Sequence, residues 1–174
     1  MAGKNQKRLL TKKELYKKIK EVKLVLTDND GVLTDTGVYY SSKGEELKRF
    51  SIRDGMGVER LYIICGIKTG IITGELSGSV KKRAEKLKID NLFLGVKEKH
   101  LILPTILKKN KLELKNIAYI GDDVNDIEII KLVGFSACPG DAMQEIKSLV
   151  NYVCNKEGGN GAFREFAELI IKYH

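Results

Sequence analysis

The chain has 174 residues, 43% of them hydrophobic, which fits one domain with a buried core. No apolar run is long enough to span a membrane or to form a signal-peptide core, so we expect a cytoplasmic protein. The net charge is +8, but eight basic and one acidic side chains in residues 1–20 account for +7 of it. The basicity is therefore a property of an N-terminal extension, and we expect neither a nucleic-acid nor a membrane partner.

The N-terminal extension, residues 1–20, ends in the sequence TKKELYKKIK, which opens with a capping-box pair at Thr11 and Glu14. Leu15 and Ile19 are at helical spacing, so we predict a short helix that lies on the domain with a solvated basic face. A tail that binds RNA or anionic lipid is the alternative, although no RNA-binding signature supports it. The 3 cysteines have no metal-ligand spacing, and we expect reduced, buried thiols.

Residues 21–174 alternate between strand-like and helix-like segments. Pro104 should kink its helix or reset the start. The segment 37–51 has the pattern of a β-hairpin around a Gly/Ser/Lys turn, and 135–153 repeats the strand and helix alternation once more. Strands are predicted at 23–28, 68–74, 91–95 and 116–122, and helices at 54–66, 77–88, 99–110, 123–134 and 161–174.

This alternation predicts an α/β fold in which helices cover both faces of a central parallel sheet. Ligands of such folds bind beyond the carboxyl ends of the strands. Several predicted strands of this chain end in polar residues, and these ends converge on one edge of the sheet. The residues concerned are Asp28, Asp30, Thr73, Asp122, Asp123 and Asp126, with Lys99 just beyond the strand at 91–95.

The carboxylates of Asp28, Asp30 and Asp122 would gather at one sheet edge, where they repel one another unless a cation lies between them, and oxygen ligands indicate Mg²⁺. Thr73 offers a hydroxyl and backbone N–H groups, and Lys99 supplies a point charge that suits phosphate. Together these groups could hold a phosphoryl group, and a carboxylate aimed at phosphorus can act as the nucleophile. Each piece alone also fits a turn, a helix cap, a strand exit or a solvated lysine; their combination in this order favours phosphate chemistry.

The segments DNDGVLTD, IITGE, Lys99 and GDDVND resemble the four motifs of the haloacid dehalogenase (HAD) superfamily of phosphatases. Longer segments resemble the cap-less family of 3-deoxy-D-manno-octulosonate 8-phosphate (Kdo 8-phosphate) phosphatases: DGVLTDTGVYY, KRFSIRDGMG, GIITGELSGSVKKRAEKL, AYIGDDVND and GGNGAFREF. The resemblance covers about residues 22–170. It implies a Rossmann-like HAD domain over 21–174 with a small hairpin insertion, no large cap domain and Mg²⁺-dependent hydrolysis of a sugar-acid phosphate.

Carried over residue by residue, the resemblance makes Asp28 the nucleophile and Asp30 the acid that protonates the leaving alkoxide and later activates water. It implies that Mg²⁺ is held by Asp28, the backbone carbonyl of Asp30 and Asp122, with Asp126 in support. The phosphate would be bound by Thr73, Gly74 and Lys99.

The resemblance also identifies substrate-binding residues. Arg53, Asp54 and Gly55 lie in the segment that meets substrate in the Kdo 8-phosphate branch. Arg83, in the following helix, would face the same mouth and could bind a sugar carboxylate.

Glu75 and Lys86 instead resemble phosphatases that act on the 9-phosphates of nine-carbon sugar acids related to sialic acid. Their spacing is about three helical turns, so both could lie on one helix face and bind substrate there. A surface ion pair is the structural alternative. Asn29, where many members have an apolar residue, and Thr36, in place of a usual Gly, are smaller departures from the family pattern.

Members of this family form homotetramers, which implies that the hairpin at 37–51 pairs between subunits and that a neighbour helps to close each site. The segment 158–165, within a C-terminal tail of 156–174, resembles a mobile tail that reaches over an active site; a plain loop before a helix is the alternative. Two rival classes are a phospho-accepting receiver domain, in which the acids, Thr and Lys follow another order, and a non-catalytic HAD oligomerisation module, which would not need every motif group.

Overall fold

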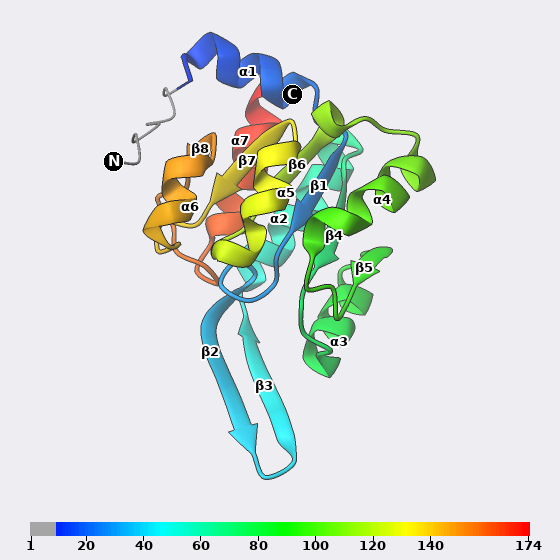
Figure 1. The fold of residues 1–174 in the computed structure, drawn as a ribbon, viewed down its shortest axis with the longest axis vertical. Coiled ribbons are helices and arrows are strands. Elements are labelled where there is room, and N and C mark those ends of the chain that lie inside the picture. The colour runs from blue at the N-terminus through cyan, green and yellow to red at the C-terminus, as the bar shows by residue number, and fades with distance from the viewer. Residues whose placement is uncertain (1–9) are drawn as a thin grey trace, which may run out of the picture.

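The computed structural model describes residues 10–174 and shows a central sheet from which a two-stranded arm projects (Figure 1). Six parallel strands lie in the order β5-β4-β1-β6-β7-β8. The predicted parallel α/β fold is confirmed, whereas the basic segment 1–9 lies outside the described residues. The strands are β1 (Leu24–Thr27), β4 (Lys68–Ile72), β5 (Asn91–Phe93), β6 (Ile117–Ile120), β7 (Phe135–Cys138) and β8 (Tyr152–Val153).

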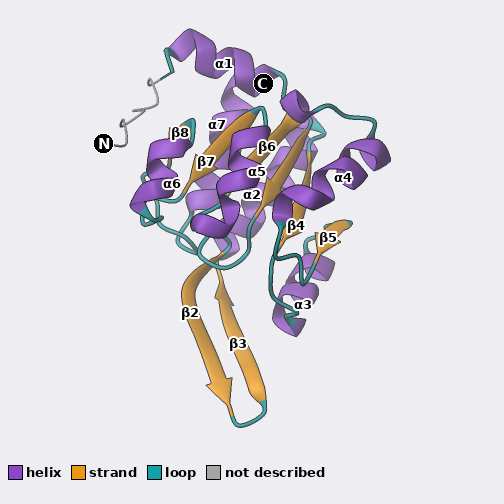
Figure 2. Ribbon diagram, viewed as in Figure 1, coloured by secondary structure: helices purple, strands orange, loops and turns teal. Residues whose placement is uncertain are grey.

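Helices cover both faces of the sheet, as predicted (Figure 2). One apolar cluster joins the sheet to α2 (Ile52–Cys65), α3 (Gly78–Lys86) and α7 (Ala162–Tyr173). The other joins it to α4 (Leu103–Asn110), α5 (Ile127–Leu132) and α6 (Gln144–Leu149). Successive residues of β1 alternate between these clusters, because neighbouring side chains in a strand point to opposite faces. Among the described residues, no helix is long and apolar enough to cross a membrane.

The first described helix, α1 (Lys12–Lys20), has the predicted capping box. The backbone N–H of Glu14 donates to Thr11 Oγ1 over 3.3 Å, and the N–H of Thr11 donates to Glu14 Oε2 over 2.8 Å. Ile19 is buried in the core, and the ring of Tyr16 stacks on Tyr173 of α7 with centroids 4.0 Å apart. The helix therefore lies on the domain as expected, next to the end of α7 (Figure 1).

Two other helix boundaries depend on local chemistry. Helix α2 starts at Ile52, earlier than predicted, because the Ser51 hydroxyl caps it by accepting from two backbone N–H groups. Gly57 lies inside α2 because a Cβ there would come within 3.1 Å of the Arg164 backbone in α7. Pro104 lies in the first turn of α4, after the 3₁₀ helix η1 (Lys99–Ile102), which confirms the predicted reset.

The arm is an antiparallel hairpin inserted between β1 and α2, formed by β2 (Thr34–Ser41) and β3 (Gly44–Phe50). It begins at Thr34 rather than at residue 37, so its first residues directly follow the loop after β1. A register shift at Tyr39 and Tyr40 marks a bulge in the opposite strand. No larger insertion occurs within residues 10–174, in agreement with the expected absence of a cap domain.

Asp54 joins α2 to α7. Its carboxylate is buried and accepts hydrogen bonds from the backbone N–H groups of Arg164, over 2.9 Å, and Gly161, over 3.2 Å. Gly159, two positions before Gly161, has a φ of +63° and donates its N–H to the carbonyl of Val32 over 2.9 Å. The segment before α7 is therefore fastened both to α2 and to the loop that follows β1.

We predict that Asp54→Ala lowers the free energy of unfolding by about 2 kcal/mol, because two buried N–H groups lose their acceptor. Urea denaturation followed by circular dichroism measures this change. Asp90→Ala is the control, since it removes only an exposed ion pair with Lys68 and should change the free energy by less than about 0.5 kcal/mol. Unchanged stability of the Asp54 variant together with lost activity would instead indicate a direct role in substrate binding.

Candidate active site

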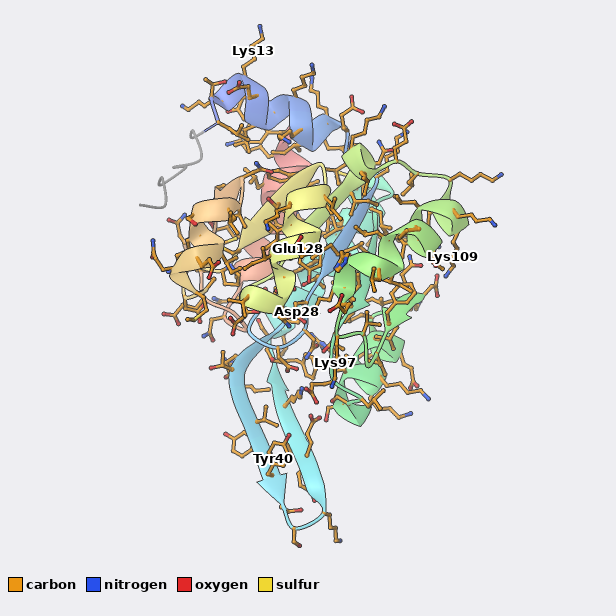
Figure 3. The ribbon with its side chains drawn as sticks, in the orientation of Figure 1. Lys13, Asp28, Tyr40, Lys97, Lys109 and Glu128 are labelled. Carbon is orange, nitrogen blue, oxygen red and sulfur yellow. The ribbon has the colours of Figure 1, made fainter. Side chains whose placement is uncertain are left out.

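Three carboxylates meet at the carboxyl ends of the central strands. Asp28 follows β1, Asp122 follows β6, and Asp126 ends the short 3₁₀ helix η3 (Val124–Asp126). One oxygen from each lies within 4.8 Å of the others, and Figure 3 shows Asp28 at the end of the sheet nearest the arm. The expected trio was Asp28, Asp30 and Asp122, so the side chain of Asp126 takes the place that was predicted for the carboxyl group of Asp30.

Two glycines allow these acids to approach the backbone. A Cβ at Gly31, whose φ is +79°, would lie 2.0 Å from Asp122 Oδ2. A Cβ at Gly121 would lie 2.2 Å from Asp126 Oδ2. Because neither position has room for a side chain, the motifs DNDG and GDD need glycine for packing reasons as well as for the turn.

Lys99 is the cation of the cluster. It opens η1, just beyond β5, and its side chain is buried. Its Nζ lies 2.7 Å from Asp28 Oδ2 and 2.7 Å from Asp126 Oδ1. Burial by itself lowers the pKa of Lys99, but the two carboxylates more than offset that effect and raise the pKa above its ordinary value, so the ammonium is charged.

With all three acids ionised, the cluster would have two more negative than positive charges, since three carboxylates face one ammonium. Burial and the neighbouring Asp126 raise the pKa of Asp28 to about 7, although Lys99 opposes this. Burial and the charge of Asp28 raise the pKa of Asp122 to about 8. A divalent cation that prefers oxygen ligands would balance this charge, so the donor set fits Mg²⁺.

Asp126 is held by hydrogen bonds to both of its oxygens. Oδ1 accepts from Lys99 and from the hydroxyl of Tyr119, 2.5 Å away, while Oδ2 accepts from the backbone N–H of Asp122 over 3.0 Å. Tyr119 belongs to β6 and is fully buried. The sequence analysis missed it because a tyrosine in a buried strand has the pattern of an ordinary core residue.

The groups predicted to bind phosphate lie at the end of β4. Thr73 is buried, its N–H donates to the carbonyl of Phe93 over 3.0 Å, and its hydroxyl oxygen accepts from the N–H of Glu75 over 3.3 Å. The backbone N–H of Thr73 is therefore used by the sheet. The hydroxyl hydrogen of Thr73 and the N–H of Gly74 are the donors left for a ligand.

Asp30 directly follows Asn29, and its carboxylate is not part of the cluster formed by Asp28, Asp122 and Asp126. Its carboxylate contacts Lys48 of β3, which sequence analysis missed. The only signal in the sequence was a lysine in an alternating hairpin strand, and that pattern does not show which face of the hairpin meets the domain.

Comparison with known proteins identifies the family of this fold and site. Residues 95–166 match the haloacid dehalogenase-like hydrolases. The 3-deoxy-D-manno-octulosonate 8-phosphate phosphatase of Haemophilus influenzae is 35% identical over 158 residues, which cover 91% of this chain and 87% of that protein. The chain belongs to this phosphatase family. The Escherichia coli K12 phosphatase of the same name is also 35% identical, over 91% of this chain and 84% of its own length.

Solved structures of the family have the same fold. The phosphatase from Moraxella catarrhalis, crystallised with magnesium ion, phosphate ion and a KDO molecule, is 38% identical, covers 94% of each chain and has a TM-score of 0.90. The cobalt-bound phosphatase from Haemophilus influenzae is 35% identical, covers 90% of this chain and 91% of that one, and has a TM-score of 0.86. The HAD fold and the assignment as an enzyme of phosphatase type are thereby confirmed.

The predicted sugar-contacting residues of this phosphatase lie in different environments. Arg53 is exposed in the first turn of α2. Arg83 donates to the carbonyl of Ser51 over 2.8 Å, and Gly55 is glycine because a Cβ would come within 2.5 Å of that guanidinium. The two oxygens of Asp54 accept hydrogen bonds from the N–H groups at the start of α7, and its contact with substrate stays a prediction.

The expectation that Glu75 and Lys86 share a helix face is wrong. Glu75 precedes Ser77, the residue that caps α3, so it is not part of the helix. Lys86 ends α3 and lines a pocket with Lys68 and Asp90, at the amino-terminal ends of β4 and β5. Within one chain, therefore, Lys86 lies at the opposite end of the sheet from the acid cluster.

We predict that the free energy of unfolding of metal-free protein falls as the pH rises from about 4 to about 8. In that window the folded state keeps protons on Asp28 and Asp122, whose pKa values are raised to about 7 and about 8, while the unfolded chain has lost them. Denaturation in EDTA at several pH values measures the effect. Added Mg²⁺ should stabilise the protein more at the upper end of the window.

Two variants test the origin of this pH dependence. Asp122→Asn should remove much of it, because it deletes one of the raised carboxyl groups. Asp90→Asn, an exposed acid outside the cluster, should leave it intact. Stability that is constant or rises across the window would contradict the charge assignment.

Proposed function

We propose that this chain is a Mg²⁺-dependent phosphatase that hydrolyses Kdo 8-phosphate, a 3-deoxy-ulosonic acid phosphate, through an aspartyl-phosphate on Asp28. The observation that carries the proposal is the cluster of Asp28, Asp122 and Asp126, in which Lys99 pairs with Asp28 and Asp126. The Moraxella relative, named for that reaction and crystallised with magnesium, phosphate and KDO, supports the choice of substrate and metal. A cytoplasmic location belongs to the proposal and fits three free cysteines.

Mg²⁺ would be held by the carboxylates of Asp28 and Asp122 and by the backbone carbonyl of Asp30. Asp126 is left to support them, because it is fully buried and its oxygens accept from three protein donors. When bound, the ion neutralises the excess charge of the acids and withdraws charge from the phosphate oxygens. In this arrangement Asp126 aims Lys99 and fixes the backbone of Asp122.

Asp28 is the nucleophile in this proposal. The N–H of Asn29 holds its Oδ1 over 2.6 Å, and Lys99 holds Oδ2 over 2.7 Å, so the carboxylate plane is fixed. A carboxylate oxygen attacks phosphorus while the bond from phosphorus to the sugar oxygen breaks, and Asp30 gives its proton to that oxygen. Asp30 then takes a proton from a water molecule whose oxygen attacks phosphorus. The bond from phosphorus to Asp28 breaks, which releases phosphate and restores Asp28.

The phosphate oxygens would be bound by donors around the nucleophile. Lys99 supplies the positive charge, and the hydroxyl of Thr73 and the N–H of Gly74 supply hydrogen bonds from the end of β4. These donors are in place before substrate arrives, which is the condition for stabilising the charge of the transition state. The sugar would lie beyond them, toward the exposed Arg53 and Glu75.

Kdo 8-phosphate is favoured over a nine-carbon 9-phosphate by the position of Lys86, which does not join Glu75 near the site of its own chain. A non-catalytic role is disfavoured because the three acids converge around a buried Lys99 that pairs with two of them. We infer that the sugar carboxylate is bound by Arg53 or by Arg83 after it leaves the Ser51 carbonyl.

We predict that the protein with Mg²⁺ releases phosphate from Kdo 8-phosphate faster than from nine-carbon ulosonate 9-phosphates, and that EDTA abolishes release. Asp28→Asn should retain below about 1% of the turnover while the fold is unchanged, because the amide cannot form the acyl phosphate. Colorimetric phosphate release measures both. Asp35→Asn is the matched control and should stay active, since Asp35 pairs with Arg49 outside the site.

Equal weak release from every sugar-acid phosphate would contradict a dedicated enzyme. Release that favours the nine-carbon substrates would support the alternative branch. No release from any of them, or from p-nitrophenyl phosphate, would support a non-catalytic oligomerisation module.

We also infer that the arm pairs with other copies in a homotetramer. Tyr39 and Leu47 are cross-strand partners with 65% and 64% of their surfaces exposed, on a two-stranded ribbon whose outer edges lack partners within the described chain. Figure 3 shows Tyr40 on the arm, away from the domain. Leu76 and Val124, close in sequence to Thr73 and Asp122, are also exposed, and a neighbouring subunit could cover them.

We predict that Leu47→Glu shifts the protein from tetramer toward monomer and lowers turnover about tenfold, because a site left open to water loses electrostatic stabilisation. Size-exclusion chromatography with light scattering and a turnover assay measure the two effects. Ser42→Glu, an equal charge change in the tip of the same hairpin, should change neither by much. A fully active monomer would contradict the shared site.

A further inference from the structure

The carboxylate of Asp30 is held by three side chains. Lys48 Nζ lies 2.7 Å from both Oδ1 and Oδ2. Oδ1 also accepts from the amide of Asn29 over 3.0 Å and from the hydroxyl of Thr34 over 3.3 Å. Oδ1 is therefore saturated with donors, and Oδ2, which accepts from Lys48 within the described residues, is the oxygen better placed to exchange a proton with a substrate.

Lys48 is itself fixed from the other side. Its side chain is only 1% exposed, whereas that of Asp30 is 31% exposed. Glu45 lies 3.3 Å from Lys48 Nζ and also accepts a short hydrogen bond from the hydroxyl of Ser77, which caps α3. The bulge opposite Tyr39 and Tyr40 gives Glu45 and Lys48 the same side of β3.

This arrangement orders a long, flexible side chain and removes its ammonium from water, both of which are unfavourable unless several partners compensate. A lysine whose only task was to fix the arm could bond to any carboxylate at its base. Here Lys48 Nζ instead contacts both oxygens of Asp30, the acid proposed to protonate the leaving group. Asp30 follows the end of β1 in a loop, so its orientation depends on such side-chain contacts.

We propose that Lys48 is a positioning residue that sets the orientation of the Asp30 carboxylate for proton transfer to the leaving group. This inference rests on the proposed role of Asp30. Lys48 does not touch the reacting atoms: it supplies the fixed charge against which Asp30 is oriented, and Glu45 with Ser77 fixes Lys48. Through Lys48 and Asp30, the arm thus contributes to the chemistry of its own subunit.

The test uses substrates that differ in their need for a proton. A phenolate and a sugar alkoxide leave slowly without an acid, whereas p-nitrophenolate leaves readily. We expect Lys48→Met to lower kcat/KM about 100-fold for Kdo 8-phosphate and about tenfold or more for phenyl phosphate, but less than about threefold for p-nitrophenyl phosphate, since a positioned general acid contributes roughly 10²–10⁴-fold. The two aryl phosphates keep the test independent of the identity of the natural sugar.

Three variants complete the design. Lys43→Met makes the same change in the tip of the hairpin and should leave all three rates unchanged. Lys48→Arg should restore part of the loss, because it keeps a bidentate cation. In an Asp30→Asn background, Lys48→Met should cause no further loss, because residues that act through one another are not additive.

The possible outcomes separate the alternatives. An equal loss on all three substrates, or full additivity with Asp30→Asn, would overturn the proposal in favour of a structural or phosphate-binding role, and unchanged rates would overturn it outright. Circular dichroism and light scattering establish that the variant is folded and assembled like the parent protein. Wild-type failure on Kdo 8-phosphate with activity on the aryl esters would reject the proposed substrate but not the role of Lys48.

Discussion

The structure of this protein depends on an imbalance of charge: three carboxylates at the ends of neighbouring strands, two of them buried and one half-buried, lie around a single lysine. Such a group is tolerated because parallel strands bring their carboxyl ends together beside a space where a cation and a phosphate can be bound. Tyr119, the N–H of Asp122 and Lys99 orient the acids in advance. Charge that is unfavourable for the free protein is therefore what gives the site its affinity for a metal cation, and the cation together with Lys99 would in turn attract a phosphoryl group.

The loop after β1 is held from several sides. A Cβ at Gly158 would lie 1.9 Å from the carbonyl oxygen of Gly31, so the segment before α7 packs directly on the turn that carries Asp30. Asp54 fastens the other side of that segment to α2. Residues far apart in the sequence thus fix a turn that lies between Asp28 and the arm. This packing explains the glycine at position 158, while Gly159 and Gly161 have φ values of +63° and +109°, which favour glycine.

Much of the fold and the acid cluster could be predicted from the sequence, because both depend on local patterns. Apolar strands that end in acids predict where Asp28 and Asp122 lie, and the order of motifs indicates the family. Asp54 and Lys86 could not be placed in this way. The partner of Asp54 is more than a hundred positions away in α7, and Lys86 was placed by assuming that the helix begins before Glu75. Lys48 was missed because a bulge in β3 decides which side chains face the domain, and the amino-acid sequence does not reveal that bulge.

The arm has two unlike faces separated by a single residue. Leu47 points outward and Lys48 points toward Asp30, because adjacent side chains in a strand lie on opposite sides. A slip of β3 by one position would exchange them, turning a charged group to the outer face and withdrawing the partner of Asp30 in the same event.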